Sequence, residues 1–216
     1  MLKKLIYSIL AGISISIGSI VYLLVENKTV GALLFSVGIM MVIEFKFLLF
    51  TGYVPTQRNK QKITDYLINC LFVLCGNIIG CALVAGLMYF TRIGASLYDK
   101  ALAVSNVKIN DSPLSILILA MFCGFIIAMI VKANNFKKQV LYSAFMIAVF
   151  ILSSFEHVVA DAFYLTMSLK LFTWKGLLVL VMALLGNFIG GYASSFIDNE
   201  PKPVLENKEN EKASEK

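Results

Sequence analysis

Six apolar segments, each long enough to cross the hydrocarbon core of a bilayer, dominate this chain of 216 residues. A membrane-spanning helix needs about 20 residues, and backbone groups at that depth must be satisfied within the segment, which favours helices. The segments cover residues 5–25, 30–50, 66–90, 114–131, 140–169 and 177–196. We therefore predict an all-α membrane protein with six transmembrane helices.

The composition supports lipid as the main solvent. Hydrophobic residues make up 59% of the chain and charged residues only 15%, which is too little polar surface for a water-soluble domain. The net charge of +6 could indicate a nucleic-acid partner. In a membrane protein, however, an excess of basic residues is better explained by topology. The chain has one histidine, and its four cysteines lack metal-ligand spacing, so neither a metal nor another cofactor is expected.

The basic residues predict the orientation. If the N-terminus is cytoplasmic, the short inner segments carry Lys3, Lys4, Arg58, Lys60, Lys62, Lys132, Lys137 and Lys138. The outer segments then carry Lys28, Arg92, Lys100, Lys108, Lys170 and Lys175. This modest bias predicts a multi-pass protein of a bacterial cytoplasmic membrane with both termini inside. Residues 1–197 would form the membrane domain, and the polar segment 198–216 a disordered cytoplasmic tail.

Two of the six segments are irregular. Charged or helix-breaking residues interrupt the second at Glu44, Lys46, Gly52 and Pro55, and the fifth at Glu156, His157 and Asp161. A charge at membrane depth costs several kcal/mol unless it faces a cavity or a partner. We expect the second and fifth helices to be broken, with Gly52 and Pro55 permitting the break in the second.

A repeated motif divides the chain into halves. Gly-Asn-x-Ile-Gly occurs as Gly76, Asn77 and Gly80, and again as Gly186, Asn187 and Gly190. One such motif would indicate close helix packing. Two, separated by 110 residues, indicate repeats at about 1–100 and 101–197. Three spans in each half make these repeats inverted, as in many transporters.

These motifs together resemble the formate/nitrite transporter family. The resemblance rests on Phe-Ser-Val-Gly-Ile at 35–39, Leu-Phe-Thr-Gly at 49–52, Phe-Glu-His at 155–157 and both Gly-Asn motifs. It implies an aquaporin-like fold, a homopentamer with one pore in each protomer, and passage of formate, nitrite or hydrosulfide.

The resemblance also implies roles for individual residues. His157 would be the central pore histidine and Lys108 would pair with Glu156. One constriction would consist of Leu49, Phe50 and Thr51, where the Leu-Phe-Thr loop breaks the second helix, and a second of Phe35, Ile39 and Phe150.

Three positions depart from the family pattern. Residues 122–125 lack the usual asparagine of the fourth span, residues 45–48 read Phe-Lys-Phe-Leu, and Asp161 replaces an asparagine. The sequence therefore leaves the anion open, with formate expected by family default.

The chemistry of these residues suits an anion. Broken helices present N-termini that attract negative charge, Thr51 offers a hydroxyl, and the charge of His157 can change near neutral pH. Our hypothesis is that His157 donates a hydrogen bond or a proton to a small anion, which makes transport pH-dependent. The alternatives are a neutral-solute pore, disfavoured by the missing Asn-Pro-Ala pair, a non-transporting membrane subunit, and an intramembrane enzyme, for which one histidine supplies no metal site.

Overall fold

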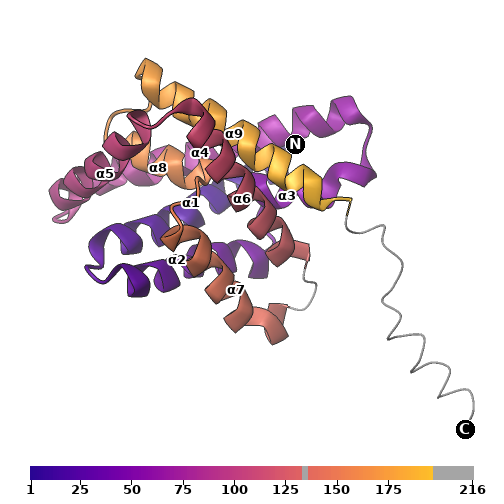
Figure 1. The fold of residues 1–216 in the computed structure, drawn as a ribbon, viewed down its shortest axis with the longest axis horizontal. Coiled ribbons are helices and arrows are strands. Elements are labelled where there is room, and N and C mark those ends of the chain that lie inside the picture. Colours follow the sequence, from indigo (N-terminus) through magenta and orange to yellow (C-terminus); the bar gives the residue numbers. More distant parts are fainter. Residues whose placement is uncertain (133–135, 197–216) are drawn as a thin grey trace, which may run out of the picture.

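The computed structural model describes residues 1–132 and 136–196, and this part of the chain consists of helices joined by turns and loops (Figure 1). Its elements are α1 (Leu2–Leu24), α2 (Lys28–Glu44), α3 (Phe50–Gln57), the 3-10 turn η1 (Arg58–Lys60), α4 (Ile63–Met88), α5 (Gly94–Ile109), α6 (Pro113–Lys132), α7 (Phe136–Leu152), α8 (Val158–Met167) and α9 (Trp174–Ser194). The expected tail, 198–216, lies outside the described residues.

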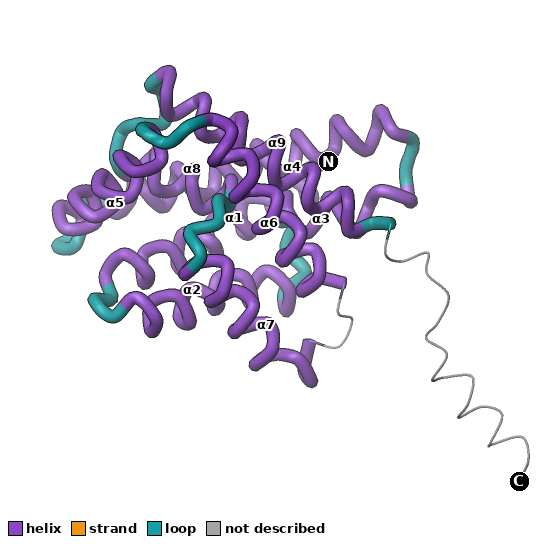
Figure 2. The backbone as a smooth tube through the Cα atoms, viewed as in Figure 1, coloured by secondary structure: helices purple, strands orange, loops and turns teal. Residues whose placement is uncertain are grey.

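Four helices, α1, α4, α6 and α9, are long and apolar enough to cross a membrane by length and composition. They match four of the six expected spans. Where the sequence predicts the second span, the structure has α2 followed by α3, and where it predicts the fifth, α7 followed by α8. Figure 2 draws the segments that separate the two members of each pair as loops.

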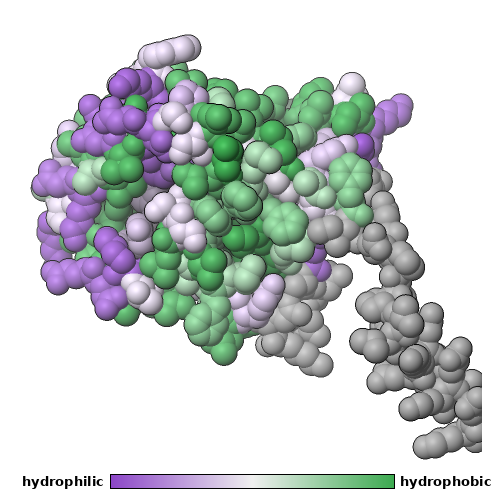
Figure 3. All heavy atoms as spheres, in the orientation of Figure 1, coloured by the Kyte–Doolittle hydropathy of each residue, from purple (hydrophilic) through white to green (hydrophobic). Residues whose placement is uncertain are grey.

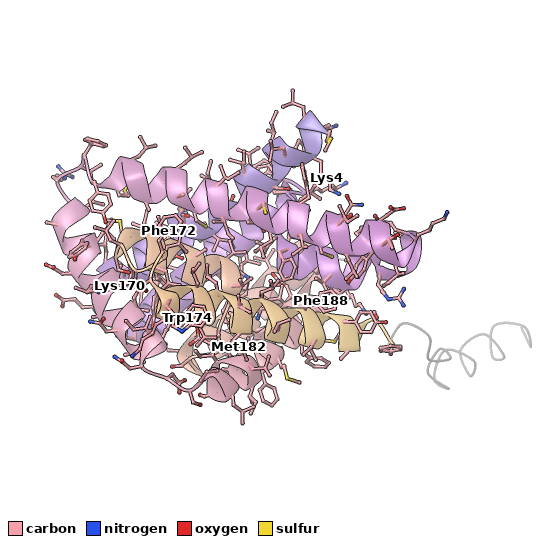
Figure 4. The ribbon with its side chains drawn as sticks, turned by 90° about the horizontal axis from the view of Figure 1, so that it is seen from above. Lys4, Lys170, Phe172, Trp174, Met182 and Phe188 are labelled. Atoms are coloured by element: carbon pink, nitrogen blue, oxygen red, sulfur yellow. The ribbon has the colours of Figure 1, made fainter. Side chains whose placement is uncertain are left out.

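The surface is apolar over the middle of the molecule, and hydrophilic side chains gather at the end where α5 lies (Figure 3). Large apolar side chains such as Ile68, Leu87 and Phe122 are exposed. A water-soluble protein rarely exposes so much apolar surface, so this face suits lipid or another membrane protein. At the end where α9 begins, Phe172 and Trp174 are also exposed (Figure 4), and aromatic residues of this kind are common at membrane–water interfaces.

The two gaps between short helices have the same backbone geometry. Lys46 and Ser154 both have φ of 55°, the left-handed conformation. Just beyond each of them, the next N–H reaches back five residues: Phe47 N–H donates to the Val42 carbonyl at 2.9 Å, and Phe155 N–H donates to the Phe150 carbonyl at 3.0 Å. This pattern is a Schellman cap, which ends a helix and turns the chain away from its axis.

The position expected for the break in the second span is therefore wrong. Gly52 and Pro55 lie inside α3, and the Leu-Phe-Thr sequence is not a loop, because Phe50 and Thr51 form the first turn of that helix. The break covers residues 45–49 and includes Leu49, the residue just before α3. It arises from the left-handed cap at Lys46. Such caps are usually formed by glycine, so a lysine at this position does not predict one.

The motif glycines allow two pairs of helices to approach closely, α4 with α1 and α9 with α6. A Cβ atom on Gly80 would lie 2.2 Å from the Ile9 carbonyl oxygen, and one on Gly190 would lie 1.9 Å from the Met121 carbonyl oxygen. A Cβ atom on Gly76 would lie 2.4 Å from Ser8 Cβ, and one on Gly186 would lie 2.4 Å from the Leu117 carbonyl oxygen. Only glycine fits at such distances, so the asparagine between the glycines is held against the neighbouring helix.

Candidate functional site

Asn77 fixes the N-terminus of α3 from the side. Its carboxamide oxygen accepts the Phe50 N–H at 2.9 Å. Its NH₂ group donates to the Leu48 carbonyl at 2.8 Å and to the Ser8 carbonyl on α1 at 2.7 Å. The buried amide thus satisfies one N–H of α3 and two carbonyl groups, all of which lie away from water.

Asn187 makes the same three bonds in the second half of the chain. It accepts the Val158 N–H at the start of α8 at 2.9 Å, and it donates to the carbonyls of Glu156 and Ala120, both at 2.8 Å. The Gly-Asn motifs are therefore more than packing contacts, because each asparagine caps a short helix from a neighbouring helix. The sequence analysis missed this role.

The N-termini of α3 and α8 meet at Thr51 and His157. The Thr51 hydroxyl oxygen lies 3.1 Å from His157 Nε2. On the other side of the ring, His157 Nδ1 accepts the Ala160 N–H at 3.3 Å and so caps α8. Since Nδ1 is an acceptor here, the geometry assigns the proton of the neutral ring to Nε2, which donates to Thr51.

In each short helix, the residue after the N–H that the asparagine accepts carries the next backbone N–H. This residue is Thr51 in α3 and Val159 in α8. Within the described part of the chain, neither of these N–H groups has a hydrogen-bond partner. Thr51 is fully buried and Val159 equally so. Two helix N-termini with free N–H groups therefore converge on the Thr51–His157 pair, and helix N-termini of this kind attract anions.

Aromatic and aliphatic side chains close the site on both sides. Phe35 and Phe150 meet edge to face with ring centroids 6.0 Å apart, and the Phe150 and His157 centroids are 6.1 Å apart. Five of the residues expected at the constrictions, Phe35, Ile39, Leu49, Phe50 and Phe150, are buried. Within this apolar setting, His157 is only 2% exposed.

A cavity of about 210 Å³ reaches His157 from the side where α5 packs. Its lining includes Tyr22 from α1, Phe150 from α7, and a charged group formed by Lys108, Glu156 and Asp161. Lys108 Nζ forms ion pairs with the Glu156 carboxylate and, at 2.9 Å, with Asp161 Oδ1. Four of the expected site residues, His157, Phe150, Glu156 and Lys108, thus line one space.

Asp161 is the residue that the sequence analysis left without a role. Asp161 pairs with Lys108, which lies 53 residues earlier in the chain. This contact joins α8 to α5, so no local pattern in the sequence could reveal it. Cys123 and Gly124 occupy the stretch where family members carry an asparagine; Cys123 is buried, and Gly124 packs against the Asn187 backbone.

A family model described as formate/nitrite transporter matches residues 1–196. The chain belongs to this family. It is therefore a multi-pass membrane protein of a family of channels and transporters for small anions, which are not enzymes, and the intramembrane-enzyme alternative is set aside.

Two relatives and two solved structures agree with this assignment. The chain is 29% identical over 181 residues to the uncharacterized transporter YrhG of Bacillus subtilis, covering 76% of this chain and 68% of YrhG. It is 27% identical over 155 residues to the formate channel FocA of Haemophilus influenzae, covering 66% of this chain and only 55% of FocA.

The fold matches two solved structures over most of their length. A pentameric formate channel with formate bound has a TM-score of 0.76 at 24% identity, with coverage of 91% of this chain and 94% of the other. An FNT family ion channel has a TM-score of 0.76 at 21% identity, with coverage of 93% and 91%. At this level of identity the two structures show that the fold is shared.

Proposed function

We propose that this chain conducts a small monovalent anion, with formate as the first candidate and nitrite or hydrosulfide as the other two. The observation that carries the proposal is the meeting of two short-helix N-termini at the Thr51–His157 pair. Membership of the family and similarity to the formate channel FocA support the substrate class.

In this proposal α2 with α3 forms an interrupted second span, and α7 with α8 an interrupted fifth span. The two halves, about 1–100 and 101–197, are then inverted repeats within one membrane domain. The equal caps at Lys46 and Ser154 support this division. Because both short helices direct their N-termini to the same point, their partial positive charges add there, and this offsets part of the cost of bringing an anion to membrane depth.

His157 acts in this proposal as a hydrogen-bond donor to the anion. An anion that enters beside Thr51 would receive the Nε2–H bond that the hydroxyl now accepts. The alternative is transfer of a proton from a charged ring. It fits the geometry less well, because a proton on Nδ1 would face the Ala160 N–H that this nitrogen now accepts.

The buried rings set the size limit in this proposal. Phe35, Ile39 and Phe150 would form the gate beside the cavity, and Leu49 and Phe50 the gate on the other side. Small movements of these side chains would open a path for an ion that has shed most of its water. Large or strongly hydrated ions would be rejected, since a dry apolar constriction replaces none of their hydration.

We also propose a homopentamer in the bilayer of a bacterial cytoplasmic membrane, with both termini in the cytoplasm. The match to a pentameric formate channel supports the assembly. The apolar exposed face of α4, with Ile79, Leu83 and Leu87, supplies surface that suits a neighbouring protomer or lipid.

Flux in proteoliposomes tests this function. Formate, nitrite and hydrosulfide are compared with glycerol, and the expected result is passage of at least formate without glycerol. His157→Asn should lower formate flux about tenfold to hundredfold, because hydrogen bonds to charged groups contribute about 1.5–3 kcal/mol. Asparagine can still cap α8, so the fold is retained.

Thr166→Val is the matched control, because the Thr166 hydroxyl on α8 donates to the Ala162 carbonyl of the same helix. Its flux should equal that of the unaltered chain. Glycerol passage without anion passage would support a neutral-solute pore instead, and unchanged formate flux in His157→Asn would remove the histidine from the mechanism.

A further inference from the structure

The cluster of Lys108, Glu156 and Asp161 has one cation for two carboxylates. Lys108 Nζ contacts Glu156 Oε2 and lies 2.9 Å from Asp161 Oδ1, so the two carboxylates are neighbours across a single ammonium group. Asp161 is 1% exposed and Glu156 is 5% exposed. If all three groups were ionised, the cluster would hold one uncompensated negative charge in a buried site, which is a costly arrangement.

One oxygen of the cluster has no partner. Asp161 Oδ2 is buried and makes no hydrogen bond in the described part of the chain, although Asp161 lines the cavity that leads to His157. A buried carboxylate oxygen that is left unpaired is destabilising. An empty hydrogen-bonding position and an excess negative charge thus coincide at the same carboxyl group.

Among the described residues, the surroundings of the cluster supply no second positive charge. The titratable groups near the cluster are Tyr22 on α1, Lys108 on α5, Cys123 on α6, Glu156 and His157 before α8, and Tyr164 on α8. Of the residues that line the cavity, Lys108 alone is a cation, and it already contacts both carboxylates.

We propose that this cluster is a proton-binding site, with the proton on Asp161 Oδ2, and that the bound proton admits an anion to the cavity beside His157. The second half of this statement rests on the proposed anion conduction. The step is simple protonation: the carboxylate takes one H⁺ from the aqueous side and becomes a neutral carboxyl, and no other bond changes.

A proton suits the position better than a metal cation. Hard cations such as Na⁺ or Ca²⁺ need several oxygen ligands, whereas the ammonium group of Lys108 already lies between the two carboxylates. A proton needs only one oxygen atom. Protonation also changes what the cavity presents to an anion, because an ionised carboxylate only accepts hydrogen bonds and repels negative charge, while a carboxyl group donates.

The site is distinct from His157 in both position and chemistry. His157 uses Nδ1 to cap α8 and Nε2 to contact Thr51, so its hydrogen bonds are complete with a neutral ring. On Asp161, a proton removes the excess negative charge of the cluster and supplies an O–H that can donate to an anion in the cavity. The acid dependence of transport would then arise from the cluster rather than from the imidazole.

Infrared spectroscopy of the purified protein tests the proton site without any transport assay. The unaltered chain should show the C=O band of a buried protonated carboxyl, and the band should grow as the pH is lowered from about 8 to about 5. Asp161→Asn should lose the band. Asp99→Asn is the matched control, since Asp99 is an exposed carboxylate on α5, and it should keep the band. Absence of the band from the unaltered chain overturns the proposal, and loss of the band in Glu156→Gln but not in Asp161→Asn overturns the assignment to Asp161.

Flux then tests the coupling. Formate uptake by the unaltered chain should rise about tenfold or more as the pH on the cavity side falls through this range; a tenfold change corresponds to about 1.4 kcal/mol. In Asp161→Asn the rise should shrink to less than about threefold, because the proton-binding carboxyl group is gone. An unchanged rise in Asp161→Asn overturns the coupling. If the infrared band is present and no anion passes under any condition, the proton site stands and the proposed function fails.

Discussion

At the scale of single residues, the Thr51 hydroxyl and the His157 ring form one unit. The ring orientation is fixed from both sides, by Ala160 N–H at Nδ1 and by Thr51 at Nε2. Thr51 in turn lies in the first turn of α3, where its own N–H is free within the described chain. An anion at this point would meet the N–H of Thr51, its hydroxyl and the imidazole together.

Replacing Thr51 with valine removes the hydroxyl at nearly constant volume. We expect formate flux to fall about tenfold in Thr51→Val, because one hydrogen bond to the anion and the support of the His157 ring are lost together. The measurement is initial flux into proteoliposomes at equal protein content. Thr56→Val is the control on the same helix, because its hydroxyl bonds to the carbonyls of Gly52 and Tyr53 within α3. Equal losses in both variants would show that the effect is structural.

The sequence predicted single residues well where a residue type is unusual for its depth. A histidine and a glutamate in an apolar run are rare enough to draw attention, and both His157 and Glu156 line the cavity. Their partners were harder to predict. The resemblance suggested Lys108 for Glu156, but the contact of Lys108 with Asp161 depends on how α5 packs against α8, which is a tertiary property.

At the scale of elements, the two short helices depend on asparagines from their neighbours. Asn77 and Asn187 each satisfy one N–H and two carbonyls that are otherwise shielded from water. A short helix gains little from its own hydrogen bonds. The fixed position of α3 and α8 therefore rests largely on these lateral bonds and on packing.

Asn77→Leu and Asn187→Leu should each destabilise the protein by about 3 kcal/mol or more, because three buried backbone groups lose their partners at about 1–3 kcal/mol each. Thermal unfolding in detergent would show the loss as a lower Tm. The effects should be similar in the two variants, since the bonds are equivalent. Asn110→Ala is the control: Asn110 is exposed, its NH₂ bonds within its own segment and its oxygen meets only an exposed lysine, so its Tm should change little. A large difference between Asn77→Leu and Asn187→Leu would argue against the equivalence.

The motif glycines give a second test of element packing. In Gly190→Ala the new methyl would lie 1.9 Å from the Met121 carbonyl oxygen, so α9 must move away from α6 and the Tm should fall by several degrees. Gly86 on α4 has nothing within 4 Å of an added Cβ. Gly86→Ala should therefore be neutral or slightly stabilising, because alanine favours a helix more than glycine does.

The breaks show where prediction from sequence ends at this scale. Apolar length located the four long helices, whose cores match the expected spans. The break in the second span was predicted from residue type at Gly52 and Pro55, whereas the chain turns at Lys46. In the fifth span the chain turns at Ser154, just before the expected Glu156 and His157. A left-handed cap on lysine or serine is disfavoured locally and persists because the following segment is held elsewhere, by Asn77 and Asn187. That support is invisible in a local sequence window.

At the scale of the whole molecule, side-chain contacts divide the helix ends into two groups. At one end Lys4 bonds to Asn69, and the Arg58 guanidinium lies 5.1 Å from the centre of the Tyr192 ring. This end gathers the starts of α1 and α4 and the end of α9. At the other end, Lys100 donates to the Leu24 carbonyl at 3.3 Å and Tyr89 donates to the Met167 carbonyl at 2.5 Å.

This division sharpens the prediction of orientation. Lys108 was counted among the outer basic residues, but its side chain is only 11% exposed and is paired with two carboxylates in the cavity rather than free in a loop. Without it the outer loops hold one basic residue fewer, and the excess of lysine and arginine at the end with the N-terminus grows. Such an excess favours the cytoplasmic side.

The orientation can be read from the labelling of single introduced cysteines. Thr64 at the start of α4 and Thr91 after α4 are both exposed and uncharged, so replacing them leaves the charge bias intact. In intact spheroplasts, a membrane-impermeant thiol reagent should label Thr91→Cys at once. It should label Thr64→Cys only after the membrane is opened. Labelling of the unaltered chain gives the background from Cys75, which is the exposed native cysteine among the described residues. The reverse pattern would place the cavity beside Lys108 on the cytoplasmic side, and an anion entering from outside would then meet the Leu49–Phe50 gate before His157.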